Sequence, residues 1–150
     1  MTSSNQVVDC CDMEPRGLSP SAYEALADFR YELRHFLRFS ERAVRASGLD
    51  PQEYQLLLAV KGTPQGRCAT IEFLAEQLQI GHRCAVELVE RMESRGLVRR
   101  VGGRDRRGTV SVELRSRAES LLSLLAAFHC SELRCAAPAL LRTLEVLLEL

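Results

Sequence analysis

The sequence lacks several features that define common classes of protein. Its 20 basic and 20 acidic residues are equal in number, which argues against a uniformly basic coat for nucleic acid. Residues 1–17 have no cationic start followed by an apolar run, as a secretory signal would. No stretch approaches the ~18 consecutive apolar residues of a membrane span. We therefore expect a cytoplasmic protein that does not bind a membrane.

The cysteines do not predict a metal centre. Their positions fit no zinc-ligand spacing, and in the cytoplasm we expect most of them to be reduced thiols: Cys10, Cys11, Cys68, Cys84, Cys130 and Cys135. His129 and Cys130 with Cys135 come nearest to a metal motif, but positions five apart on a helix diverge by about 140°. The sequence also offers no nucleophile, base and orienting group together. We expect no metal, no cofactor and no enzymatic activity.

At 150 residues the chain is long enough for one domain with its own core. The central feature of that domain is predicted by residues 70–95, which have the pattern of two short helices joined by a tight turn. Thr70 can cap the first helix, and Arg95-Gly96 ends the second. Apolar residues recur on one face of each helix at a spacing of three and four: Ile71, Leu74, Ala75 and Leu78 in the first, and Ala85, Leu88, Val89 and Met92 in the second. This pattern predicts a helix-turn-helix, whose second helix can enter a DNA major groove.

The next segment predicts a β-hairpin. Residues 97–101 and 109–114 have strand composition, the second run alternating strictly, and Gly102-Gly103 helps the chain to turn between them. Residues 104–107, Arg-Asp-Arg-Arg, lie at the expected tip. A helix-turn-helix followed by a hairpin with a cationic tip is typical of a winged helix.

Four pieces of this region, in order, resemble the MarR family of bacterial transcription regulators. They are the Arg-Gly-Leu-Val segment that ends the second helix (95–98), the basic residues of the strand that follows (99–100), the Asp-x-Arg tip (105–108) and the alternating strand (110–114). The resemblance covers roughly residues 20 to 150. Three departures are visible: the wing tip is about one residue shorter than usual and lacks Asp-Pro, Gln79 stands where the turn often has glycine, and Arg115-Ser116 replaces the usual threonine.

Positive charge is concentrated on this unit although the whole chain is neutral. Residues 81–117 hold 10 arginines and 5 acidic residues, a net charge of +5. Nineteen of the 20 basic residues are arginine, Lys61 being the exception. The arginine fork suits phosphate and guanine edges, but a GC-rich coding genome explains this bias equally well.

Helices are expected on both sides of the winged helix. The capping box at Ser21–Glu24 predicts a helix to about Ser47, and Asp50-Pro51 with Glu53 predicts a core helix after it. A second capping box at Ser116–Glu119 predicts a helix to about Ala136, where Pro138 forces a break or kink. We expect residues 1–20 to be a flexible arm and 21–150 to be one mostly α-helical domain, with a DNA-binding lobe at 50–115 and dimerisation helices at 21–48 and 116–150.

The final segment predicts an interface with a second copy. It would leave a large apolar patch on a monomer, carried mainly by Leu140, Leu141, Leu144, Leu147 and Leu148. In proteins that the sequence resembles, the terminal helices of two chains interlock. The resemblance also implies a small aromatic or phenolic effector as a possible ligand between these helices and the DNA-binding lobe.

The predicted DNA contacts follow from the start of the second helix near His82. His82, Arg83, Cys84 and Glu87 are expected in the major groove or beside it, and Arg91 and Arg95 are expected to reach phosphate. By the resemblance, Asp105 braces the hairpin and Arg107 enters the minor groove, with Arg104 and Arg106 also near DNA. A solvated turn would explain the tip arginines without DNA, and packing would explain His82 and Cys84.

The sequence is compatible with three functions. The first is a homodimeric transcription regulator that binds a pseudopalindromic operator, and we expect a repressor in preference to an activator. The second is a thiol-based redox sensor on the same scaffold, since Cys10 and Cys11 lie on the expected arm and Cys84 lies at a helix N-terminus, where the dipole favours a thiolate. The third is a winged-helix protein-interaction module that does not bind DNA.

Overall fold

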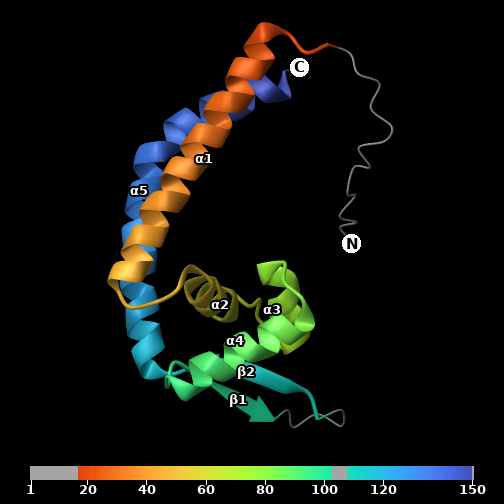
Figure 1. Ribbon diagram of the computed structural model, residues 1–150, viewed down its shortest axis with the longest axis vertical. Coiled ribbons are helices and arrows are strands. Elements are labelled where there is room, and N and C mark those ends of the chain that lie inside the picture. The colour runs from red at the N-terminus through yellow and green to blue at the C-terminus, as the bar shows by residue number, and fades with distance from the viewer. Residues whose placement is uncertain (1–16, 103–107, 150) are drawn as a thin grey trace.

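The computed structural model describes residues 17–102 and 108–149 and shows a long helical arm joined to a small lobe (Figure 1). The elements follow in the order α1 (Pro20–Ala46), α2 (Pro51–Lys61), α3 (Ile71–Leu78), α4 (His82–Ser94), β1 (Val98–Gly102), β2 (Val110–Leu114) and α5 (Ser116–Leu148). Helices α1 and α5 run antiparallel, side by side, as the arm. The remaining elements form the lobe at one end. The predicted fold class, mostly helical with a hairpin wing after a helix-turn-helix, is confirmed.

The core of the lobe is built from the faces that the apolar spacing predicted. Ala85, Leu88, Val89 and Met92 of α4 are each at most 2% exposed. Leu88, Val89 and Met92 pack in one cluster with side chains from every other element of the lobe: Leu56, Leu57, Leu74, Leu97, Val98 and Val112. Because one face of α4 is held in this way, its opposite face is left to solvent.

The turn between α3 and α4 is tight although it contains no glycine at its critical position. Thr70 caps α3 by accepting the Phe73 N–H at 3.2 Å, as expected. Gln79 ends the helix in the left-handed conformation with φ 54°, alone among the described non-glycine residues in having positive φ. The Ile80 N–H then bonds back to the Ala75 carbonyl at 3.0 Å. The left-handed backbone conformation that this turn requires is therefore adopted by Gln79 in place of the usual glycine.

The hairpin packs against the start of α3. β1 and β2 pair antiparallel from Val98 opposite Leu114 to Gly102 opposite Val110. The residue before α3 adds an isolated antiparallel bridge to β2, between Thr70 and Ser111. The Val112 N–H also donates to the Ala69 carbonyl at 2.9 Å. These bonds fix the base of the wing relative to the helix-turn-helix.

Two predicted helix starts were wrong in position. α1 is capped by Ser19, whose hydroxyl accepts the Ala22 N–H at 3.2 Å, and Pro20 takes the favoured first helical position. Ser21 instead shares a hydrogen bond with the Ser19 hydroxyl. α5 begins after Arg115 with no side-chain cap. The cap of α2 is as predicted, with Asp50 and Glu53 forming a capping box.

The prediction of a break or kink at Pro138 was wrong as to the break, because α5 runs through this residue as one helix of 33 residues, and the kink stays a prediction. Proline removes only one N–H from the helical ladder. Half-buried residues lie on both sides of it, including Ala137 and Ala139, and α1 packs along the same stretch. Tertiary packing therefore outweighs the lost hydrogen bond.

Helix α5 also corrects the expectation about apolar length. By length and composition it could cross a membrane, since one 18-residue window has a mean hydropathy of 1.2 and is only 11% buried. The apolar residues of α5 are spread along the helix and are not consecutive, so the sequence contains no uninterrupted apolar run at this position. Such a helix is weak evidence for a membrane, but its exposed apolar surface requires an explanation.

Candidate nucleic-acid interface

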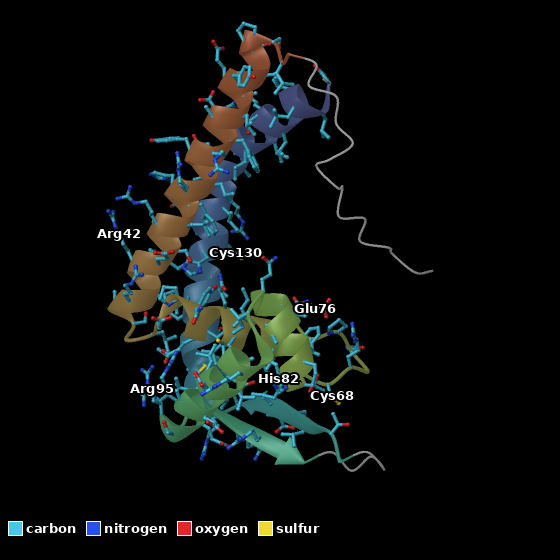
Figure 2. The ribbon with its side chains drawn as sticks, turned by 45° about the vertical axis from the view of Figure 1, so that its right-hand side comes forward. Arg42, Cys68, Glu76, His82, Arg95 and Cys130 are labelled. Atoms are coloured by element: carbon cyan, nitrogen blue, oxygen red, sulfur yellow. The ribbon has the colours of Figure 1, made fainter. Side chains whose placement is uncertain are left out.

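The exposed face of α4 carries the residues that were predicted to meet the major groove. His82, Arg83, Cys84 and Glu87 are all exposed, because the residues between and beyond them fill the core. Gly81 caps the helix without a side chain, which leaves the first turn open to a ligand. Figure 2 shows His82 at this end of α4, beside the α3–α4 turn.

Two weak ion pairs hold these side chains at the surface. Arg83 Nε donates to Glu87 Oε1 at 3.0 Å, with the two side chains 92% and 60% exposed. His82 Nε2 lies 3.4 Å from Glu72 Oε1 of α3. The pKa of Glu72 is lowered by its own backbone N–H and by His82. Exposed pairs of this kind contribute little stability, so both Arg83 and His82 can exchange them for other partners.

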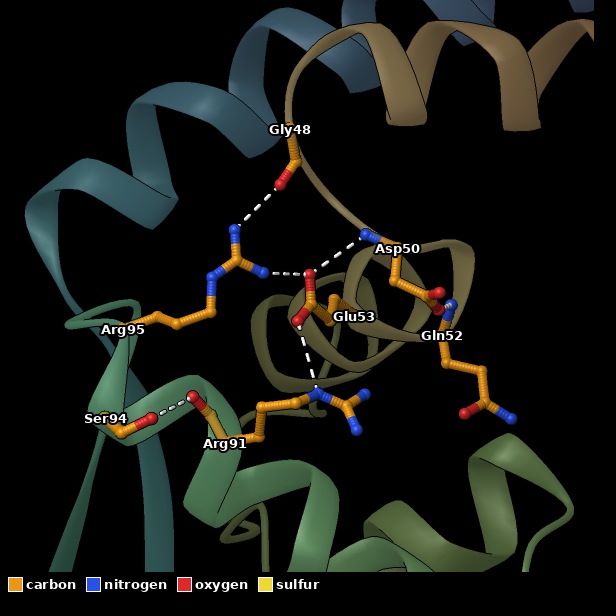
Figure 3. Close-up of polar contacts among 7 residues, drawn as sticks. All are labelled: Gly48, Asp50, Gln52, Glu53, Arg91, Ser94 and Arg95. Carbon is orange, nitrogen blue, oxygen red and sulfur yellow. Dashed lines mark hydrogen bonds and ion pairs between the residues drawn. The ribbon is translucent and has the colours of Figure 1, made fainter.

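Arg91 and Arg95, which were predicted to reach phosphate, both lie beside an acidic side chain of the lobe. Both guanidinium groups point toward Glu53 of α2 (Figure 3), with Arg91 Nε 3.5 Å from Glu53 Oε1 and Arg95 hydrogen-bonded to Glu53 Oε2. The sequence indicated Glu53 only as part of a helix cap. Its pairing could not be seen there, because Glu53 and Arg95 are 42 residues apart.

Arginines of β1 brace the wing. Arg99 Nη2 lies 2.7 Å from Glu113 Oε2 on the opposite strand. Arg100 pairs with Glu93 of α4 through its side chain at 2.9 Å and its backbone N–H at 3.0 Å. These bonds lower the pKa of Glu93, the backbone N–H contributing most. Arg99 and Arg100 were not singled out in the sequence, although Arg99 and Glu113 are cross-strand partners in the predicted hairpin.

Several predicted site residues lie outside the described residues. These are Arg104, Asp105, Arg106 and Arg107 of the wing tip, together with Cys10 and Cys11. The proposed minor-groove contact of Arg107 and the brace from Asp105 therefore stay predictions.

The cysteines and histidines form no metal site within residues 17–102 and 108–149. Cys68, Cys84, Cys130 and Cys135 are free and exposed. His129 is instead buried, and its Nδ1 lies 2.7 Å from the Tyr54 hydroxyl. Burial lowers the pKa of His129 and is the main cause that raises the pKa of Tyr54.

The predicted dimerisation residues lie at the far end of the arm from α4 (Figure 1). Leu141, Leu144 and Leu148 are 57%, 38% and 85% exposed, while Leu140 and Leu147 are half-buried against the arm. Large apolar side chains are also exposed along the neighbouring surfaces, on α1 and earlier in α5: Tyr23, Leu26, Leu33, Leu37, Leu124 and Phe128. Large apolar side chains are thus exposed on both helices of the arm.

Comparison with known proteins identifies this architecture. Residues 47–108, which span α2 to the hairpin, match the model of the MarR family. No curated protein matches the sequence. Among solved structures, the chain is similar to AbsC, a MarR family transcriptional regulator from Streptomyces coelicolor (TM-score 0.66, 21% identity, 81% of each chain covered).

Two further solved structures extend the comparison. A MarR family protein from Bacillus stearothermophilus has a TM-score of 0.65 at 19% identity, covering 78% of this chain and 80% of that one. The M. tuberculosis transcriptional regulator MOSR, solved in complex with DNA, has a TM-score of 0.53 at 23% identity, covering 72% and 77%. The proteins of this family are transcription regulators and not enzymes. The resemblance in the sequence is therefore confirmed: residues 47–108 match the model of the MarR family, and the chain has the winged helix-turn-helix fold of the solved MarR family structures.

Proposed function

We propose that this protein is a transcription regulator that binds double-stranded DNA as a homodimer on a pseudopalindromic operator, and that it represses its target. The observation that carries the proposal is the outer face of α4. It is held open by the packing of Leu88, Val89 and Met92 and carries the exposed groups of His82 and Arg83. A guanidinium at the start of a recognition helix suits guanine edges in the major groove.

The proposed dimer is supported by the arm. A monomer would leave the apolar side chains of α1 and α5 in water, Leu148 being 85% and Leu124 69% exposed. Exposed apolar surface on this scale marks an interface. A second copy is the partner proposed, since a two-fold axis would place this surface of each chain against the same surface of the other. Two lobes joined in this way would read two half-sites in opposite orientation.

The experiment is selection of binding sites from random duplexes at low salt, using the full chain. The proposal expects an enriched pseudopalindrome with half-sites about one helical turn apart, ~10 bp. No enriched site and no bound DNA would favour the protein-interaction alternative, and DNA bound equally at every sequence would contradict sequence-specific recognition. Release of the selected duplex by small aromatic or phenolic compounds then tests the proposed effector, and a reporter gene behind the site separates repression from activation.

A redox-sensing regulator is the second candidate, and the exposure of Cys84 in the first turn of α4 favours it. Oxidation of this thiol would place charge or bulk in the proposed DNA interface. The test compares the affinity of reduced and peroxide-treated protein for the selected duplex. An affinity that peroxide leaves unchanged, in the wild type and in Cys84→Ser alike, excludes this candidate.

A further inference from the structure

Glu53 lies at the meeting point of three segments of the chain (Figure 3). It is in the first turn of α2 and only 2% exposed, the one buried carboxylate among the described residues. Its Oε2 accepts hydrogen bonds from the Asp50 N–H at 2.9 Å and from Arg95 Nη1. Its Oε1 lies 3.5 Å from Arg91 Nε. One acidic side chain thus engages both arginines at the C-terminal end of α4.

Arg95 continues this network to the base of the arm. Its Nη2 donates to the Gly48 carbonyl at 2.7 Å, in the segment that joins α1 to α2. Arg91 and Arg95 are one helical turn apart at the end of α4, so the last turn of the recognition helix is tied to that junction. The position of α4 relative to the arm therefore depends on Glu53.

The same carboxylate restricts the charge that α4 offers to DNA. The side chains of Arg91 and Arg95 are 53% and 39% exposed, so neither is shut off from solvent. Free arginines at these positions would contact phosphate of any sequence. Burial raises the pKa of Glu53, but the Arg95 hydrogen bond, the Asp50 N–H and the two guanidinium charges outweigh it and hold the pKa below its usual value. Glu53 is therefore ionised at neutral pH.

We propose that Glu53 is a positioning residue for selective DNA binding, which withholds Arg91 and Arg95 from phosphate and fixes the end of α4 against α2. This inference rests on the proposed function. It differs from a purely structural role in one respect: removal of the carboxylate has opposite effects on two kinds of DNA. Binding to unrelated sequence strengthens because two cations are released, and binding to the operator loses selectivity because α4 is no longer fixed.

The principal test compares the wild type with Glu53→Gln, using the selected operator and a random duplex over a range of salt concentrations. We expect the variant to bind the random duplex several-fold more tightly, with a salt slope steeper by one to two. The ratio of operator to random affinity should fall about tenfold. The matched control is Glu41→Gln, which removes the same charge from the exposed pair with Arg45 on α1 of the arm and should leave that ratio within about twofold of the wild type.

A second variant keeps the test informative if Glu53→Gln does not fold. Arg91→Gln alters an exposed side chain. It should leave the salt slope of random-duplex binding unchanged, since this arginine is already paired with Glu53. A slope reduced by about one would mean that Arg91 contacts phosphate in the wild type, and would overturn the inference. So would a folded Glu53→Gln variant whose slope and affinity ratio both match the wild type. A wild type that shows no preference for any duplex would instead refute the proposed function itself.

Discussion

His129 of α5 and Tyr54 of α2 are joined inside the protein, with His129 Nδ1 2.7 Å from the Tyr54 hydroxyl and the two rings packed edge to face. The contact links the arm to the DNA-binding lobe. Phe36 and Phe39 of α1 also pack their rings against His129. The imidazole is therefore surrounded by apolar rings, and protonation would place a charge among them.

This environment predicts that the protein loses stability below about pH 6.5, the usual pKa of histidine. Burial lowers the pKa of His129 in the folded state, so the unfolded chain binds the proton first as the pH falls. The free energy of unfolding therefore decreases from pH 6.5 down to the folded pKa and is then level with respect to this group. Thermal unfolding between pH 8 and 5 measures the effect. The contribution of Glu53 is separate, because its lowered pKa acts only below about pH 4.5.

The variant that checks this assignment is His129→Phe. It should remove most of the pH dependence between 7 and 5.5 while leaving Tyr54 without its hydrogen-bond partner. His35→Gln is the control, since His35 is exposed on α1 and should leave the dependence unchanged. An unaltered slope in His129→Phe would assign the pH effect to another group.

Substitution of Arg83 should alter base preference more than overall binding. Arg83→Ala removes a guanidinium that is 92% exposed at the start of α4. We expect a loss of ~1 to 3 kcal/mol on the selected duplex and relaxed preference at one position of each half-site. Repeated site selection with the variant measures this. Arg104→Ala is the comparison at the wing: if only a phosphate contact is lost, affinity falls for every sequence and the salt slope falls by about one.

Charges placed on the arm should dissociate the dimer. Leu141→Glu with Leu144→Glu puts two carboxylates into the exposed apolar surface of α5, where a partner chain would have to bury them. Light scattering should then report a folded 16.8 kDa monomer in place of a dimer. Leu58→Glu is the matched control, because Leu58 is 46% exposed on α2 of the lobe.

The same samples decide between a second copy and a membrane as the partner of α5. Sedimentation with phospholipid vesicles should leave the wild-type protein in the supernatant. A wild type that is monomeric at every micromolar concentration and sediments with vesicles would contradict the proposed dimer.

Gln79→Gly should stabilise the fold without affecting DNA binding. Gln79 holds φ 54°, a conformation that costs an ordinary residue about 1 kcal/mol and costs glycine little. Part of that gain is offset by the greater entropy of glycine in the unfolded chain. We expect the free energy of unfolding to rise by about 0.5 kcal/mol in urea titrations. A destabilised variant would show that the Gln79 side chain makes a contribution of its own.

Most features governed by local chemistry were predictable from the sequence, the helix starts predicted at Ser21 and Ser116 being the exceptions. The caps at Thr70 and Asp50 and the buried face of α4 follow from residues within one or two helical turns of each other. The interpretation of Arg95 as a phosphate contact was reached from α4 alone, and the structure joins Arg95 to Glu53 on another helix. The continuity of α5 through Pro138 depends in the same way on packing with α1. Interactions between distant segments were the part that periodicity and spacing could not supply.

The central claim is that two copies of this chain read two half-sites through α4. Hydroxyl-radical footprinting of the selected duplex, combined with the mass of the complex in solution, tests it most directly. The account predicts two chains per duplex and two symmetric protected patches about one helical turn apart, ~34 to 36 Å. The double substitution Leu141→Glu with Leu144→Glu should weaken the protection of both patches together. A single patch protected by one chain, or protection that the double substitution leaves intact, would contradict it.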